Sequence, residues 1–181
     1  MEASCQVWYD AFYFVQGQQK MITIRPITTA EIPAARRVIL QMAYDIYGWE
    51  GGLEASIRYW EASGEFDDMA NVEEQYFQNC GLFLVILDDK KVIGSGAVKK
   101  FNASTAELKR LWLLEEYHGQ GIGYRVVSQL IDFSQTNNYK RIILQTSPEQ
   151  TRAITFYKKL GFQEIESYNQ KAGEISLELQ L

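Results

Sequence analysis

Residues 117–123 read Tyr117-His118-Gly119-Gln120-Gly121-Ile122-Gly123 and place three glycines at alternate positions. An apolar run precedes this stretch, and apolar residues at helical spacing follow it. Glycine adopts positive φ readily and lets a ligand approach the backbone closely. A glycine-rich turn that opens a helix directs several unpaired N–H groups at one point, where the helix dipole also favours negative charge. The stretch therefore predicts a binding site for a phosphate group.

The segments around this turn alternate between strand and helix patterns. Helices are expected over about 28–43, 67–80, 122–138 and 151–160, and the segment 44–66 is less regular and rich in aromatic residues. Strands are expected at 22–26, 82–87, 91–98, 106–114, 142–144, 162–168 and 174–181. The order β-α-α-β-β-β-α-β-α-β-β predicts a single α/β domain with a mixed sheet.

The first twenty residues are expected to lie outside this domain, which would span 21–181. Met21 opens the first expected strand, and the preceding residues 1–20 contain several aromatic side chains. These aromatics could pack on the domain surface or form a homodimer contact. An N-terminal extension without a role is the alternative interpretation.

Composition limits the class of protein. The 181 residues suffice for one well-buried domain. The net charge of −5 argues against a nucleic-acid partner, because nucleic-acid-binding domains usually have a basic excess. The single histidine, His118, leaves no material for a histidine-based metal centre, so no metal cofactor is expected.

The sequence also predicts a cytoplasmic protein without a membrane partner. No apolar run approaches the length of a membrane span. Residues 1–20 lack the pattern of a secretory signal, because they begin with acidic Glu2 and Asp10 interrupts their apolar part. The two cysteines, Cys5 and Cys80, lie far apart without a CxxC pair, which favours reduced thiols.

Several kinds of site use a glycine-rich turn, and their requirements differ. A dinucleotide-binding fingerprint needs Gly-x-Gly-x-x-Gly after a strand near the chain start, which is not the pattern here. A P-loop needs Gly-Lys-Ser/Thr at its end, whereas Gly123 is followed by Tyr124. A tight strand-to-helix connection without a ligand is the remaining structural alternative.

A second motif follows the glycine turn by about one helix and one strand. It reads Ala153-Ile154-Thr155-Phe156-Tyr157-Lys158-Lys159-Leu160-Gly161-Phe162. Together the two motifs closely resemble the GNAT superfamily of N-acetyltransferases, over roughly residues 21–181. In that family an Arg/Gln-x-x-Gly-x-Gly/Ala turn binds the pyrophosphate of acetyl-coenzyme A, and an Ala-x-x-hydrophobic-Tyr-x-x-x-Gly-Phe helix closes the site.

The resemblance implies a mostly antiparallel mixed sheet, flanked by helices, whose fourth and fifth strands splay apart. The cosubstrate would be acetyl-CoA, with no metal. His118 departs from the family pattern, because it stands where Arg or Gln is usual, and it is either a phosphate contact or an exposed loop residue. The residues that the resemblance assigns to the coenzyme are Leu111, Trp112 and Leu113 for pantetheine, His118, Gly119, Gln120, Gly121, Ile122, Gly123 and Tyr124 for pyrophosphate, and Gln150.

The resemblance also assigns two catalytic side chains. Tyr157 matches the family's general acid, which protonates the departing thiolate. The alternative for Tyr157 is an aromatic ring that fills the core face of a helix. Glu107 lies where some members place the carboxylate that takes the amine proton, directly or through water, and a solvated carboxylate at a strand edge is its alternative.

The implied function is transfer of an acetyl group to a primary amine by direct reaction in a ternary complex. A small-molecule amine is the acceptor expected here, and the aromatic content of 44–66 suggests an apolar or aromatic one. A protein acetyltransferase that acts on an N-terminal or lysine amine is one alternative. A regulatory module that binds coenzyme A without turnover is another.

Overall fold

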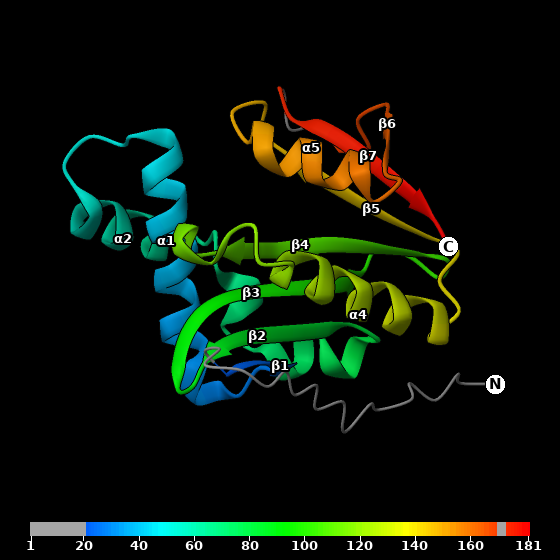
Figure 1. The fold of residues 1–181 in the computed structure, drawn as a ribbon, viewed down its shortest axis with the longest axis horizontal. Coiled ribbons are helices and arrows are strands. Elements are labelled where there is room, and N and C mark those ends of the chain that lie inside the picture. Colours follow the sequence, from blue (N-terminus) through cyan, green and yellow to red (C-terminus); the bar gives the residue numbers. More distant parts are fainter. Residues whose placement is uncertain (1–20, 170–172) are drawn as a thin grey trace.

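The computed structural model describes residues 21–169 and 173–181, so the predictions for residues 1–20 lie outside the described part. A seven-stranded sheet with the order β1-β2-β3-β4-β5-β7-β6 forms the centre of the fold (Figure 1). Neighbouring strands are antiparallel except for β4 and β5, which are parallel. The predicted mixed, mostly antiparallel α/β sheet is therefore confirmed.

The strands follow the predicted order, but three α-helices instead of two lie between β1 and β2. The strands are β1 (Ile22–Pro26), β2 (Leu82–Asp88), β3 (Lys91–Lys100), β4 (Thr105–Leu113), β5 (Arg141–Thr146), β6 (Gln163–Ile165) and β7 (Ile175–Gln180). The α-helices are α1 (Ile32–Tyr47), α2 (Leu53–Ala62), α3 (Val72–Gln75), α4 (Ile122–Thr136) and α5 (Thr151–Lys159). The helix α2 falls inside the segment that the sequence left without regular structure.

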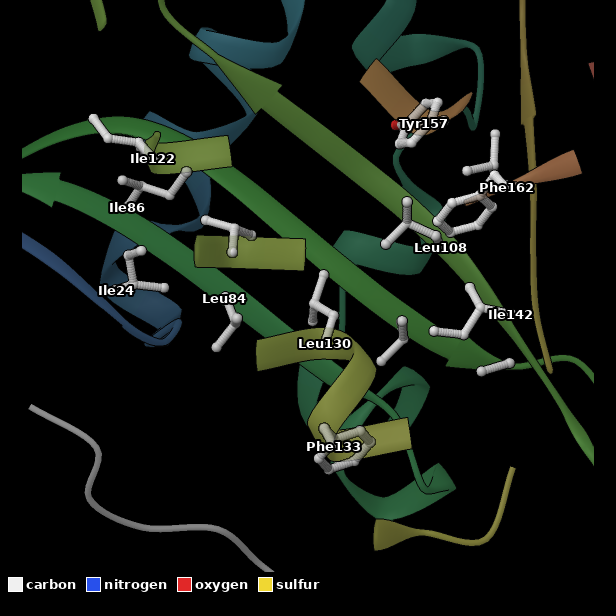
Figure 2. Close-up of a cluster of buried hydrophobic side chains, with 14 of the residues drawn as sticks. Ile24, Leu84, Ile86, Leu108, Ile122, Leu130, Phe133, Ile142, Tyr157 and Phe162 are labelled. Carbon is white, nitrogen blue, oxygen red and sulfur yellow. The ribbon is translucent and has the colours of Figure 1, made fainter. Parts of the chain in front are cut away.

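Two apolar cores lie on opposite faces of the sheet. On one face α4 and α5 cover β2 to β5 with a cluster that includes Leu108, Leu130 and Tyr157 (Figure 2). On the other face α1 packs with the segment after α2 on a cluster that includes Met69 and Phe83. The alternation of side chains along the strands supplies residues to both faces. Between these two cores lies the central strand β4, which contains Glu107 and the predicted pantetheine residues 111–113.

Close contact between α4 and β3 depends on Gly96. A Cβ atom added there would lie 2.7 Å from a Val126 methyl carbon and 3.0 Å from a Leu111 methyl carbon. The missing side chain lets the helix approach the strand closely. Gly96 thereby fixes the position of the helix whose N-terminus follows the glycine turn.

The helix predicted over 67–80 is wrong. The chain instead forms a 3₁₀ turn at Asp67–Met69, the four-residue helix α3 and a second 3₁₀ turn at Phe77–Asn79. The Asn71 side chain accepts a hydrogen bond from the Glu74 N–H (3.2 Å) and starts α3 anew. The carboxylate of Asp68 accepts a hydrogen bond from the guanidinium of Arg110 in β4. These local and tertiary bonds outweigh the apolar periodicity.

The cysteine prediction is also wrong for the residue that the structure describes. Cys80 is disulfide-bonded rather than a reduced thiol. Cys5 lies outside the described residues. Disulfides persist mainly in oxidising compartments, so the cysteines do not support the cytoplasmic location, which stays a prediction.

Candidate active site

The sheet opens between β4 and β5. These strands pair at only three positions, the last of which joins Glu107 to Ile143, although both strands continue. Figure 1 shows them meeting at one end and diverging along the rest of their length. Beyond Glu107, the side of β4 that faces β5 therefore has backbone polar groups outside the sheet ladder. The residues expected to bind pantetheine, Leu111, Trp112 and Leu113, lie in this part of β4.

A β-bulge in β4 sets which side chains face each side of this opening. The pairing with β3 shifts between Ala97↔Lys109 and Ser95↔Trp112, so β4 contains one extra residue. Arg110, within the bulge, has φ of 55°. The consecutive residues Lys109 and Arg110 both line one pocket, together with Glu107 and Leu108. This charged pair interrupts the strand alternation and was the available sequence signal for the bulge.

The glycine turn forms an uncapped helix N-terminus. Gly119 and Gly121 have φ of 77° and 73°, in the left-handed region that favours glycine. Gly121 is the N-cap of α4 and has no side chain to cap it, and the first turn of the helix contains no acidic residue. The N–H groups of Ile122, Gly123 and Tyr124 therefore point out of the helix end. Such an end suits an anion.

His118 directs its side chain back to the strand instead of extending from the turn. Its Nε2 lies 2.7 Å from the carbonyl oxygen of Leu113. Because a carbonyl oxygen only accepts, Nε2 is the donor of this hydrogen bond. The Nδ1 atom is buried and has no hydrogen-bond partner among the described residues. The half-buried ring of His118 thus bonds to the end of β4. The sequence suggests either a phosphate contact or an exposed loop residue, and neither describes this placement.

Tyr157 lies on α5 in the same core cluster as Leu108 of β4 (Figure 2). Its ring packs against Phe156 and Phe162, with centroids 5.7 and 5.6 Å away. Burial raises the pKa of Tyr157 well above the ordinary value for a phenol. Its hydroxyl has no hydrogen-bond partner among the residues that the structure describes. This phenol is therefore protonated and free to donate one hydrogen bond.

Glu107 lies at the point where β4 and β5 separate. Its Oε1 accepts a hydrogen bond of 3.0 Å from the hydroxyl of Tyr168, and its Oε2 is 3.6 Å from the Lys109 ammonium. Tyr168 belongs to the loop between β6 and β7, and burial together with the Glu107 charge raises its pKa. Sequence reasoning missed Tyr168, because nothing local to that loop indicates a contact with β4.

The pocket beside Glu107 has a volume of about 210 Å³. Of the aromatic segment 44–66, only Glu65 lines it. The rings of that segment instead pack on one another, with Trp49 between Tyr47 (5.7 Å) and Trp60 (5.1 Å). This pocket is therefore charged rather than aromatic. It is lined by Glu65, Glu107, Leu108, Lys109, Arg110, Gln145, Asn169 and Glu174.

A buried ion pair ties the bulge of β4 to the segment after α2. The guanidinium of Arg110 donates to both Asp68 carboxylate oxygens at 2.8 and 3.2 Å, and it pairs with Glu65 at 3.2 Å. The side chains of Arg110 and Asp68 are only 10% and 11% exposed. The Arg110 guanidinium also lies 5.0 Å from the centre of the Phe66 ring, and the Tyr76 hydroxyl donates to Asp68.

The pKa of Asp68 reflects this environment. Burial alone would raise it, but the hydrogen bonds and charge of Arg110, with the Tyr76 hydroxyl, outweigh burial and hold it below the usual range. Sequence reasoning missed this cluster because it joins residues that lie far apart in the chain.

Gln150, expected to contact the coenzyme, bonds within the protein. Its amide donates to the Tyr47 hydroxyl (2.8 Å) and accepts from the Thr146 hydroxyl (3.0 Å). The Tyr47 hydroxyl also lies 2.9 Å from the Ser147 hydroxyl. The end of α1 is thereby joined to the β5–α5 connection.

The separated parallel strands, the uncapped glycine turn and the buried tyrosine beside them form the arrangement of a known family. The sequence profile of the Acetyltransferase (GNAT) family matches residues 49–162. The chain belongs to this family.

Two relatives match about half of the chain. Human N-acetyltransferase 8B is 32% identical over 101 residues, which are 52% of this chain and 44% of the relative. N-acetylaspartate synthetase of Danio rerio is 30% identical over 100 residues, which are 54% of this chain and 36% of the relative. The chain thus spans less than half the length of either protein.

Solved GNAT structures share the fold. The PaiA N-acetyltransferase of Thermoplasma acidophilum, in complex with coenzyme A, superposes with a TM-score of 0.73 at 22% identity, covering 88% of this chain and 99% of that chain. An acetyltransferase of Streptococcus agalactiae gives a TM-score of 0.72 at 24% identity, covering 88% and 98%. At these identities the likeness establishes the fold.

The described part of the chain was also searched for membrane-spanning helices and for metal-binding clusters. None of its helices is both long and apolar enough to cross a membrane. Residues 21–169 and 173–181 contain no group of three or more His, Cys, Asp or Glu side chains arranged to hold a metal ion.

Proposed function

We propose that the chain transfers an acetyl group from acetyl-CoA to the primary amine of a small molecule, directly and within a ternary complex. The observation that carries this proposal is the opening of β4 from β5, with an uncapped helix N-terminus on one side and a charged pocket on the other. Two substrates can meet at such an opening from opposite faces of the sheet.

The residues at the opening fit the coenzyme. The pyrophosphate would lie on the N–H groups of residues 119–124, where Gly119 and Gly121 have no side chain to obstruct it and adopt positive φ. The pantetheine arm would pair with the backbone of residues 111–113 as an added strand. Acetyl-CoA supplies a thioester, which is an acyl group activated for attack by an amine.

Glu107 and Tyr157 would divide the proton transfers. An amine must lose a proton before its nitrogen can attack, and Glu107 receives that proton directly or through water. The new C–N bond forms as the C–S bond breaks, and the sulfur leaves as a thiolate. The Tyr157 hydroxyl donates a hydrogen bond and then a proton to this sulfur. Burial raises the pKa of Tyr157, so the phenol is protonated and can donate this hydrogen bond.

Two observations favour a small acceptor over a protein. The pocket of about 210 Å³ is smaller than the usual range of ligand sites, roughly 300–1,000 Å³. The Tyr47 hydroxyl also joins the end of α1 to Ser147 and Gln150, and we expect this link to hinder an extended peptide. Among the relatives, N-acetylaspartate synthetase is named for a small-molecule product.

The test is free-thiol release from acetyl-CoA with a panel of amines. The panel contains amino acids, their amides and decarboxylated amines, aromatic alkylamines, and peptides with a free N-terminus or a lysine. Release with small amines alone would support the proposal, and release with peptides alone would favour the protein acetyltransferase. A thermal shift with acetyl-CoA but no release with any amine would favour the regulatory module.

A further inference from the structure

The pocket beside Glu107 presents charges of both signs to an acceptor. Glu65, Glu107 and Glu174 contribute carboxylates, and the bulge of β4 adds the cations of Lys109 and Arg110. These two cations differ in how firmly the protein holds them. That difference indicates which of them is available to a substrate.

Arg110 is engaged within the protein. Its guanidinium forms two hydrogen bonds to Asp68, one at 2.8 and one at 3.2 Å, and pairs with Glu65 at 3.2 Å. Its side chain is only 10% exposed. Binding a substrate through Arg110 would require breaking a buried ion pair, which is costly.

Lys109 is held more loosely. Its ammonium lies 3.6 Å from Glu107 Oε2, which is beyond hydrogen-bond distance, and 34% of the side chain is exposed. The pair is only partly exposed, and its separation of 3.6 Å makes it a weak one. Glu107 has a second partner in the Tyr168 hydroxyl and keeps it if Lys109 moves away.

The proposed function brings the acceptor's ammonium to Glu107. An acceptor with a positive charge alone would bring its own cation beside that of Lys109 at Glu107 and would offer Lys109 no anion, although Glu65 and Glu174 also line the pocket. An acceptor that also has a carboxylate avoids this repulsion, because its carboxylate can take Lys109 while its ammonium takes Glu107. In this arrangement Lys109, Glu107 and both charges of the acceptor each lie beside a charge of opposite sign.

We propose that the acceptor is an amino acid or a similar molecule with a carboxylate on the carbon next to its reactive amine, and that Lys109 binds this carboxylate. The inference rests on the proposed function and names the substrate class of the same site. It also separates this acceptor from the N-terminus of a peptide, which has no carboxylate at that carbon.

The experiment compares each of the twenty common amino acids with its amide and its decarboxylated amine in the thiol-release assay. The amide has a less basic amine than the amino acid and the decarboxylated amine a more basic one, so the two controls bracket the effect of amine basicity. The proteins are the full chain, Lys109→Gln, Lys109→Arg and the control Lys100→Gln, which replaces an exposed lysine at the end of β3. Thermal midpoints check that every variant folds.

We expect the unmodified chain to favour the amino acids over both analogues. Lys109→Gln should raise the KM for amino acids on the order of tenfold, the size of a lost charge-assisted hydrogen bond, and leave the amides nearly unchanged. Lys109→Arg should restore most of the preference, and Lys100→Gln should behave like the unmodified chain. The acetyl-CoA KM should not change.

Two results would overturn the inference while leaving the proposed function intact. One is equal use of amino acids and decarboxylated amines by the unmodified chain, which would indicate a purely cationic acceptor. The other is an equal loss for amino acids and amides in Lys109→Gln. Absence of thiol release with every amine would instead overturn the proposed function, and the role of Lys109 with it.

Discussion

The two sides of the β4–β5 opening present different chemical groups. The side toward α4 and α5 consists of backbone N–H groups at a glycine turn and of apolar side chains around Tyr157. The side toward α1 and α2 consists of charged and hydroxyl side chains, with Arg110 and Asp68 at their centre. The first side combines one continuous glycine turn with apolar residues from several strands and helices, and the second joins charged residues of β4 to those of distant segments.

This difference bears on what each side can recognise. A pyrophosphate and a pantetheine arm are the same in every reaction of acetyl-CoA, so a fixed backbone surface suits them. An acceptor amine varies between enzymes, and side chains on a strand bulge and on loops can change without disturbing the sheet. The side toward α4 and α5 is therefore named the donor side, and the side toward α1 and α2 the acceptor side.

The substitution Tyr157→Phe tests the role of the donor side and has the largest expected effect. We expect turnover to fall by about 10²-fold or more, because proton donation to the leaving thiolate is lost. Stability should change little, because the hydroxyl has no partner among the described residues and the ring contacts remain. Thiol release measures turnover, and a thermal shift with acetyl-CoA measures coenzyme binding, which should persist. An unchanged rate would remove Tyr157 from the mechanism.

On the acceptor side, Asp68→Asn should cost about 3 kcal/mol of unfolding free energy, because it leaves the buried Arg110 without its counter-charge. Urea unfolding measures the loss. The matched control is Glu54→Gln, which breaks the exposed pair of Glu54 with Arg37 and should have little effect. Equal losses in both variants would show that burial of the Asp68 pair is unimportant.

The same variant gives a pH test. The folded-state pKa of Asp68 is lowered, so its stabilisation is fully present above the ordinary aspartate pKa and is lost as pH falls through the folded value. The stability difference between the unmodified chain and Asp68→Asn should therefore be constant near neutral pH and shrink below roughly pH 4. A difference that grew on acidification would contradict the assigned sign.

On the donor side, Gly121→Ala should weaken coenzyme binding about tenfold, because a Cβ atom at φ of 73° is strained by roughly 1 kcal/mol and shifts the N–H groups of the turn. Calorimetric titration with coenzyme A measures the affinity. Gly48→Ala is the control, because Gly48 has φ of 59° at the end of α1, away from the turn. Its strain should reduce stability and leave coenzyme affinity unchanged.

The smallest expected effect belongs to Tyr47→Phe, which removes the tie between α1 and the β5–α5 connection. We expect a loss of about 1 kcal/mol in unfolding free energy, since the hydroxyl contacts with Ser147 and Gln150 disappear while the stack on Trp49 remains. Amide hydrogen exchange of residues 146–150 should become faster. Unchanged exchange there would mean that the tie does not hold the two sides together.

Much of the fold was predictable because it depends on periodic apolar residues. The strands and the helices α1, α4 and α5 were expected near their observed positions, since each has one apolar face over many residues. The segment 67–80 failed for a physical reason. Its apolar spacing competes with the cap at Asn71 and with the bond from Asp68 to β4, and only the first of these is local.

The candidate site divides in the same way. The glycine turn and Tyr157 belong to continuous motifs: the turn itself predicted a phosphate site, and the family resemblance of the two motifs assigned Tyr157 to the site. The position of His118 against Leu113 and the bonding of Gln150 to Tyr47 were not predicted. Both depend on where a side chain turns once its neighbours are packed, which periodicity does not specify.

By itself the sequence determined the order of elements, the glycine turn at the start of α4 and the family. The order of elements and the turn are set by conformational preferences and apolar faces that act within one segment, and the family is indicated by the resemblance of two continuous motifs. Only the tertiary structure decided the acceptor side, where Glu65, Asp68, Glu107, Lys109, Arg110 and Tyr168 come together from β4 and two distant loops. Charges and hydroxyls at those positions acquire a partner only when the sheet is formed, because their pairing depends on spatial distance and burial rather than on separation along the chain.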